Sequence, residues 1–285
     1  MSSGCLGTNK PVSLPYSRMQ LAEAFIMTGE LADALAALNQ HLDETPADQT
    51  ARRLRAEVLL HLPLSGNDHL EAALEDLDAL AELTAADWVQ RSIVRQRLGD
   101  LSGALADILQ AHTLTPADDR ITARYLELLL LNEDRSRARD VLAALPPTWR
   151  WLERAGDLAA DAGAFPAALE NYTAALDHLA QKMDTQSDPF AVNLKAGLLA
   201  KRAACALAAG HLDTAAADYT QLEMLLPRDP TFAFYRGLAL FLQGDLAQAR
   251  TLCRAAWERA NATLREEMAR ALTAPEYTML RDFFL

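Results

Sequence analysis

The chain has 285 residues, of which 51% are apolar but only 6% aromatic, and its formal net charge is −12. A nucleic-acid partner held through its phosphates is not expected, because such binding needs a clustered basic surface. Alanine and leucine must supply most of the core, which favours closely packed helices.

Cysteine usage and hydropathy bear on the cellular compartment. Cys5, Cys205 and Cys253 are scattered, and the last two lie on helical stripes, which is typical of reduced, buried thiols and not of a disulfide framework. The opening MSSGCLGTNKPVSLP has no basic segment followed by an apolar run, so no secretory signal is expected. No stretch of about eighteen apolar residues predicts a membrane span. We therefore expect a cytoplasmic protein whose residues 1–14 form a disordered leader.

From residue 15 onward the sequence predicts consecutive pairs of antiparallel helices. The pattern is clearest in the third pair, where apolar residues recur at spacings of three and four on both sides of a Gly99-Asp100 turn. In the fourth pair, Glu133-Asp134 stands where Gly-Asp is expected. The seven pairs are expected at 15–48, 49–84, 85–118, 119–148, 149–195, 196–229 and 230–261, with a C-terminal cap at 262–285.

A small residue occupies the same position in the second helix of every pair. A methyl group at this position lets the two helices approach closely, and a larger side chain would overpack the contact. The seven residues are Ala34, Ala73, Ala104, Ala138, Ala168, Ala215 and Ala249.

The third pair resembles the tetratricopeptide repeat (TPR) family. An early Trp88 is followed by a small Ser92, the Gly99-Asp100 turn, Ala104 and a closing Pro116. The resemblance extends from residue 15 to about 261. It implies an all-α, right-handed superhelical TPR solenoid of about seven helix-turn-helix repeats with a C-terminal capping helix. It also implies a non-enzymatic scaffold or adaptor that binds a peptide or protein segment in its concave groove.

A second regularity combines arginines on first helices with aspartates on second helices. Arg55, Arg91, Arg202 and Arg236 share one position, and Asp76, Asp107 and Asp218 share another. Bidentate ion pairs within each helix pair would explain the series, and this interpretation is favoured because the aspartate accompanies the arginine in three of four copies. An anion-binding ladder is the alternative.

In TPR proteins the first helices line the ligand groove, and the resemblance therefore implies a set of groove residues. Among them are five arginines in the middle of an otherwise acidic chain, followed by one lysine: Arg97, Arg120, Arg124, Arg150, Arg154 and Lys201. They favour a partner with an acidic segment. In the alternative interpretation, Glu127, Glu153, Asp157 and Asp161 simply neutralise the arginines. A carboxylate clamp of the kind found in some chaperone-binding TPR proteins is not expected, because Val89, Ile93 and Arg124 depart from its pattern.

An aromatic patch near the end of the array is the last groove candidate. Phe234 and Tyr235, with Phe241 and Leu242, fit either an apolar helix of a partner or the terminal segment of a second copy. The favoured interpretation is that they belong to a repeat core covered by the cap.

The sequence offers no catalytic residues, no metal ligands and no cofactor motif. The six histidines fall in different repeats without the pairing that zinc requires, and no nucleophile elbow or phosphate loop is present. Two alternatives to the scaffold stay open. One is a self-assembling structural component that forms homo-oligomers through the solenoid edge or the C-terminal segment. The other is an enzyme built on a TPR-like body.

Overall fold

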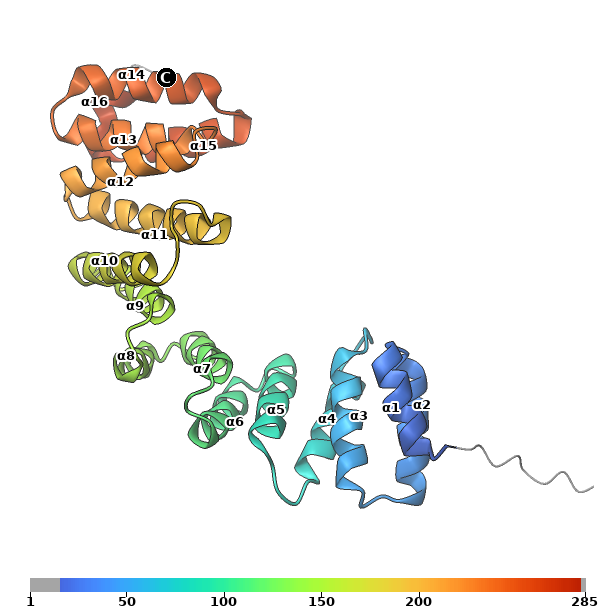
Figure 1. Cartoon of the computed structure of the whole chain (residues 1–285). Coiled ribbons are helices and arrows are strands. Elements are labelled where there is room, and N and C mark those ends of the chain that lie inside the picture. The colour runs from blue at the N-terminus through green and yellow to red at the C-terminus, as the bar shows by residue number, and fades with distance from the viewer. Residues whose placement is uncertain (1–15, 283–285) are drawn as a thin grey trace, which may run out of the picture. The chain divides into compact units, whose positions relative to one another are not determined.

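The structure is a computed structural model that describes residues 16–282, and within that range the secondary structure is α-helical apart from one short 3₁₀ helix (Figure 1). The expected leader, with Cys5, and the last three residues of the cap lie outside the described residues. The helices are α1 (Arg18–Thr28), α2 (Leu31–Glu44), α3 (Gln49–His61), α4 (Asp68–Asp78), α5 (Ala85–Arg97), α6 (Leu101–Leu114), α7 (Asp119–Leu131), α8 (Arg135–Ala144), α9 (Trp149–Asp161), α10 (Phe165–Lys182), α11 (Pro189–Ala208), α12 (Leu212–Leu225), α13 (Thr231–Leu242), α14 (Leu246–Arg259), α15 (Ala262–Ala271), η1 (Pro275–Tyr277) and α16 (Thr278–Arg281).

One helix begins earlier than its repeat was expected to begin. Helix α11 starts at Pro189, whereas the sixth pair was expected from residue 196. The Asp188 side chain accepts a hydrogen bond from the Phe190 amide, and proline at the first helical position costs no backbone hydrogen bond. These two residues extend the helix into the stretch that was expected to be a connection.

The chain divides into two compact units after Ala138, within α8. In the first unit, each helix from α1 to α7 packs against its neighbours along the chain. In the second unit, the helices from α9 to α14 pack in the same successive way, and α15, η1 and α16 follow them. Each unit thus repeats one local contact, helix against next helix, as expected of a repeat array.

The helix pairs turn on residues in the left-handed region. Gly29, Gly99, Gly163, Gly210 and Gly244 have φ values between 71° and 93°. Glycine suits these sites because it has no Cβ to clash with the backbone. In the fourth pair the same backbone conformation is adopted by Glu133, at φ 59°.

The close approach of paired helices is confirmed at the alanine series. All seven alanines have no exposed surface. On the first helices, Gly156 and Gly237 make similar close contacts: a Cβ on Gly156 would lie 2.6 Å from the Tyr172 ring, and one on Gly237 would lie 2.5 Å from Sγ of Cys253. Small residues on both helices therefore set the spacing within a pair.

The C-terminal segment completes the core of the second unit. Met268, Leu272, Tyr277 and Leu280 are buried in one cluster with Phe234 and Leu238 of α13 and Cys253 of α14. This arrangement covers the apolar face that the last helix pair would otherwise expose.

Candidate functional site

The arginine series forms ion pairs within helix pairs, as the favoured interpretation predicted. Arg55 donates to Asp76 at 2.6 and 2.8 Å, Arg91 to Asp107 at 3.0 and 2.8 Å, and Arg202 to Asp218 at 2.8 and 2.7 Å. All three contacts are bidentate, and the three aspartates are buried. The guanidinium groups are thus engaged inside the fold, which removes the anion-binding ladder as an explanation for them.

Each of these arginines also contacts the second helix of the preceding pair. The Nη1 atoms of Arg55, Arg91, Arg202 and Arg236 donate to Asn39, Asp78, Thr173 and Thr220 at 3.0, 2.8, 3.1 and 3.2 Å. Arg55, Arg91 and Arg202 therefore each join three successive helices. Arg236 has no aspartate in its own pair, and it instead forms an ion pair at 3.0 Å with Glu223 of the preceding helix α12.

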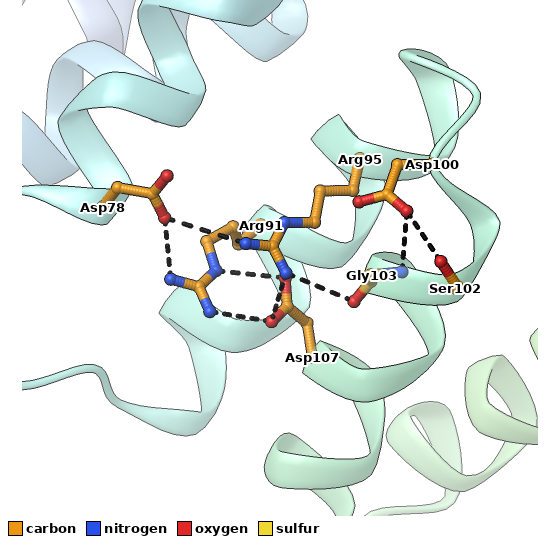
Figure 2. A network of polar contacts seen from close by, with 7 residues as sticks. All are labelled: Asp78, Arg91, Arg95, Asp100, Ser102, Gly103 and Asp107. Carbon is orange, nitrogen blue, oxygen red and sulfur yellow. Dashed lines mark hydrogen bonds and ion pairs between the residues drawn. The ribbon is translucent and has the colours of Figure 1, made fainter.

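The most connected example surrounds Asp107 (Figure 2). Its carboxylate accepts from both Arg91 and Arg95, and Arg91 also reaches the half-exposed Asp78. Arg91 lies over the Trp88 ring, with its guanidinium carbon 4.4 Å from the ring centroid. Two cations share one buried carboxylate, so Asp107 organises this whole cluster.

The groove arginines of the first unit differ in the hydrogen bonds that they form with the protein. Arg97 donates to the Leu60 carbonyl at 2.8 Å, and Arg124 donates to Gln96 and, at 3.3 Å, to Glu127. Arg120 is exposed near the start of α7. Neutralisation by Glu127 is thus observed for Arg124.

In the second unit, the carboxylates expected to neutralise arginines contact a lysine instead. Lys201 of α11 donates to Glu153 at 2.7 Å and to Asp157 at 2.9 Å, both on α9. Burial alone would lower the pKa of Lys201, but the two carboxylates outweigh it and raise that pKa. Arg150 lies 5.7 Å from the centroid of the Trp149 ring, and Arg154 is exposed.

The aromatic candidates separate into core and surface. Phe234 is 1% exposed and contributes to the apolar core, because its ring lies among Cys253, Met268 and Leu272. The core interpretation therefore holds for Phe234. Tyr235, the next residue on α13, is partly exposed and faces an open cavity.

We call this cavity, of about 510 Å³, the tyrosine cavity. Its wall combines residues of two first helices, one second helix and η1: Ala200, Ala204, Leu207, Ala208, Tyr219, Thr231, Phe232, Tyr235, Leu242, Glu276 and Tyr277. The rings of Tyr219 and Tyr235 are stacked with centroids 5.8 Å apart. Its size lies within the usual range of ligand sites, and its wall is mainly apolar.

Three of the residues that line the tyrosine cavity are tyrosines, each with a phenolic hydroxyl. Within residues 16–282, none of the hydroxyls of Tyr219, Tyr235 and Tyr277 has a hydrogen-bond partner in the protein. Burial raises the pKa of Tyr219 and Tyr235, and it raises the pKa of Tyr277 to about 12. The phenols are therefore neutral at pH 7 and can donate as well as accept hydrogen bonds.

The sequence predicted two residues of the tyrosine cavity, Tyr235 and Leu242, as groove candidates. It did not predict that Tyr219 and Tyr277 would line the same cavity. Tyr219 lies on a second helix and Tyr277 in the cap, outside the first helices to which the family resemblance assigns the groove. One signal was available, since three of the six tyrosines follow residue 200.

The described residues contain neither a membrane-spanning helix nor a cluster of metal ligands. Every helix in residues 16–282 is too short or too polar to cross a membrane. In the same range, histidine, cysteine, aspartate and glutamate side chains form no group of three or more that could hold a metal ion.

Paired antiparallel helices, small residues at their contacts and a capped end define the molecule as an α-helical repeat scaffold. Residues 201–263, from α11 to the start of α15, match the family model for the tetratricopeptide repeat. The same helix-turn-helix unit recurs before this segment. The chain thus contains a tetratricopeptide repeat in residues 201–263, within a longer array of helix pairs.

Solved structures share this fold at low sequence identity. The C-terminal part of a TPR repeat-containing protein from Cytophaga hutchinsonii is 12% identical, with 85% of this chain and 93% of that chain covered and a TM-score of 0.65. A tetratricopeptide repeat protein from Parabacteroides merdae is 15% identical, with coverages of 90% and 98% and a TM-score of 0.51. YrrB, described as a TPR protein with an unusual peptide-binding site, is 13% identical, with coverages of 73% and 100% and a TM-score of 0.50. No curated protein matches the sequence.

Proposed function

We propose that this protein is a non-enzymatic adaptor that holds a peptide or protein segment against the first helices α11 and α13, with one or two side chains in the tyrosine cavity. The observation that carries the proposal is the cavity itself, of about 510 Å³ with an apolar wall and unpaired hydroxyls. A peptide-binding site is also named in the description of YrrB, which has a similar fold.

The mechanism is preorganisation. The cavity wall is fixed by the buried cluster of α13, α14 and the cap, so binding does not have to order it. A cytoplasmic location is part of the proposal and is supported by the free, buried thiols of Cys205 and Cys253.

The acidic segment predicted from the arginines is retained as a second binding proposal. It is supported by Arg120 and Arg154, whose side chains are exposed on first helices. Arg97, Arg124 and Lys201 contribute less, because each already contacts acceptors of the protein.

The test fills the tyrosine cavity without disturbing the core. Ala204 is exposed on the cavity wall, so Ala204→Trp should occupy the cavity and leave the fold intact. Ala255→Trp, at an exposed site on α14, is the matched control. Proteins captured from a lysate by the wild type and by both variants are identified by mass spectrometry, and thermal unfolding verifies that the variants are folded.

A partner that is lost with Ala204→Trp and kept with Ala255→Trp would support the cavity proposal. A partner kept by both variants but lost with Arg120→Glu combined with Arg154→Glu would replace it with the acidic-segment proposal. Recovery of this protein alone, together with a dimeric mass in solution that becomes monomeric when residues 274–285 are deleted, would favour self-assembly.

A further inference from the structure

We infer that the tyrosine cavity selects a peptide in which a leucine-sized apolar residue is next to an arginine or lysine, with the cation paired to Glu276 at the rim. This inference rests on the proposed function and adds the chemistry of the ligand. It differs from the acidic segment that the groove arginines favoured.

The charges around the cavity disfavour an anionic ligand. Glu276 is the charged residue of the wall, and no lysine or arginine lines it. Glu276 is exposed, and within the described part of the chain its carboxylate forms no ion pair. A carboxylate brought into this cavity would face Glu276 without a compensating cation, whereas a guanidinium or ammonium group would gain one.

The aromatic wall adds to the same preference. Tyr219, Tyr235, Phe232 and Tyr277 line the cavity, and the faces of aromatic rings attract cations. The neutral phenols can accept hydrogen bonds from a guanidinium or from a peptide amide.

The apolar part of the ligand follows from the remainder of the wall. Ala200, Ala204, Leu207, Ala208 and Leu242 form a surface without polar side-chain atoms. An apolar side chain seated there removes apolar area from water, at about 25 cal/mol per Å². The cavity volume of about 510 Å³ accommodates one or two side chains and not a folded element.

The test uses four capped heptapeptides with the central residues Leu-Arg-Leu, Leu-Glu-Leu, Leu-Gln-Leu and Ser-Arg-Ser. Binding to the full-length protein labelled with 3-fluorotyrosine is followed by ¹⁹F NMR, and each signal is assigned with a tyrosine-to-phenylalanine variant. We expect Leu-Arg-Leu to shift the signals of Tyr219, Tyr235 and Tyr277 and to bind at least about tenfold more tightly than Leu-Glu-Leu, which corresponds to about 1.4 kcal/mol.

Glu276→Gln separates charge from packing. It should weaken Leu-Arg-Leu binding about fivefold, a factor worth about 1 kcal/mol, and leave Leu-Gln-Leu binding unchanged. Glu258→Gln, exposed on α14 outside the cavity wall, is the control and should change neither.

Equal binding of Leu-Arg-Leu and Leu-Glu-Leu, or an arginine preference of undiminished size in Glu276→Gln, would overturn the inference while leaving a peptide-binding cavity in place. If Ser-Arg-Ser binds as tightly as Leu-Arg-Leu, the apolar requirement is wrong. If no peptide shifts the three tyrosine signals, the inferred ligand class is wrong, and Ala204→Trp in the capture experiment decides separately whether the cavity binds a partner.

Discussion

Glu133 occupies a backbone conformation that glycine adopts at five equivalent turns. Its φ of 59° makes it the one residue other than glycine with positive φ among residues 16–282. A side chain in the left-handed region costs about 1–2 kcal/mol. The Glu133 side chain is exposed, so few contacts offset this cost.

Replacing Glu133 with glycine should therefore raise the free energy of unfolding by up to about 1 kcal/mol, after allowance for the backbone entropy that glycine loses on folding. Gly99→Ala should lower it by about 1 kcal/mol, because it introduces the same strain at φ 88°. Urea unfolding measures both changes. A destabilised Glu133→Gly protein would show that the glutamate turn is not strained.

The Asp100 carboxyl group makes the stability of the fold depend on pH. The amide of Gly103 donates to its carboxylate at 2.8 Å, and this contact, with Ser102 and Arg95, holds the pKa of Asp100 below its usual value of 3.8 (Figure 2). A pKa lowered by folding means that the carboxylate stabilises the fold above the unfolded-state pKa, and that this contribution is lost as the pH falls through the folded-state value.

We therefore expect Asp100→Ala to cost about 1 kcal/mol at pH 7, the usual value for the loss of a helix N-cap. This difference should shrink in acid, as the pH falls through the lowered folded-state pKa of the Asp100 carboxyl group. Chemical unfolding of both proteins between pH 2.5 and 7 measures the difference. A gap of constant size over that range would contradict the proposed ionic contribution.

At the scale of elements, the sequence predicted the arginine contacts within a helix pair but not those to the preceding helix. An arginine and an aspartate recur at the positions of Arg91 and Asp107, so the bidentate pairs within a helix pair could be predicted from spacing alone. The acceptors on the preceding helix could not, because they differ in type and lie 16, 13, 29 and 16 residues before their arginines. Loop insertions between pairs change that separation while the packed helices keep the contact.

Asp107 offers a direct test of this network. Asp107→Ala would leave Arg91 and Arg95 without their shared carboxylate in a largely buried setting, and we expect a loss of about 3 kcal/mol. Asp78→Ala, which removes the half-exposed acceptor, should cost at most about 1 kcal/mol. Guanidinium chloride unfolding compares the two, and equal losses would contradict the central role assigned to Asp107.

The alanine contact between paired helices makes a separate prediction. Ala215 is fully buried on α12, and Ala215→Leu should destabilise the protein by about 1–3 kcal/mol through overpacking. Ala217→Leu places the same side chain at an exposed site on the same helix and should be nearly neutral. Thermal unfolding distinguishes the two, and similar effects at both sites would indicate helix propensity as the cause.

At the scale of the whole molecule, the repeat architecture and the need for a cap followed from periodicity, but the tyrosine cavity did not. Periodicity identifies residues that every repeat shares. The cavity depends on Tyr277 and Glu276 of the cap, which belong to no repeat, and on the way the cap folds back onto α13. A site built from a unique segment has no repeated signature in the sequence.

The cap should therefore matter for stability as well as for binding. Met268→Ala removes a buried side chain from the cluster that covers α13 and α14, and we expect a loss of about 2–4 kcal/mol. Because each repeat contacts its neighbours, hydrogen exchange should accelerate most in α13 to α15 and little in α1 to α7. Uniform acceleration along the chain would instead indicate that the array unfolds as a single cooperative unit.

The contacts of Arg55, Arg91 and Arg202 across three helices have a consequence for recombining the array. A cassette cut at residues 85 and 118 carries Arg91 with Asp107 but leaves Asp78 behind, and a cassette shifted by one helix keeps Asp78 but loses Asp107. The smallest piece that retains all three is α4 to α6, one and a half repeats. Chimaeras of this protein should therefore be joined directly after a second helix that carries a hydrogen-bond acceptor. The arginine on the first grafted helix then meets a partner that is already present.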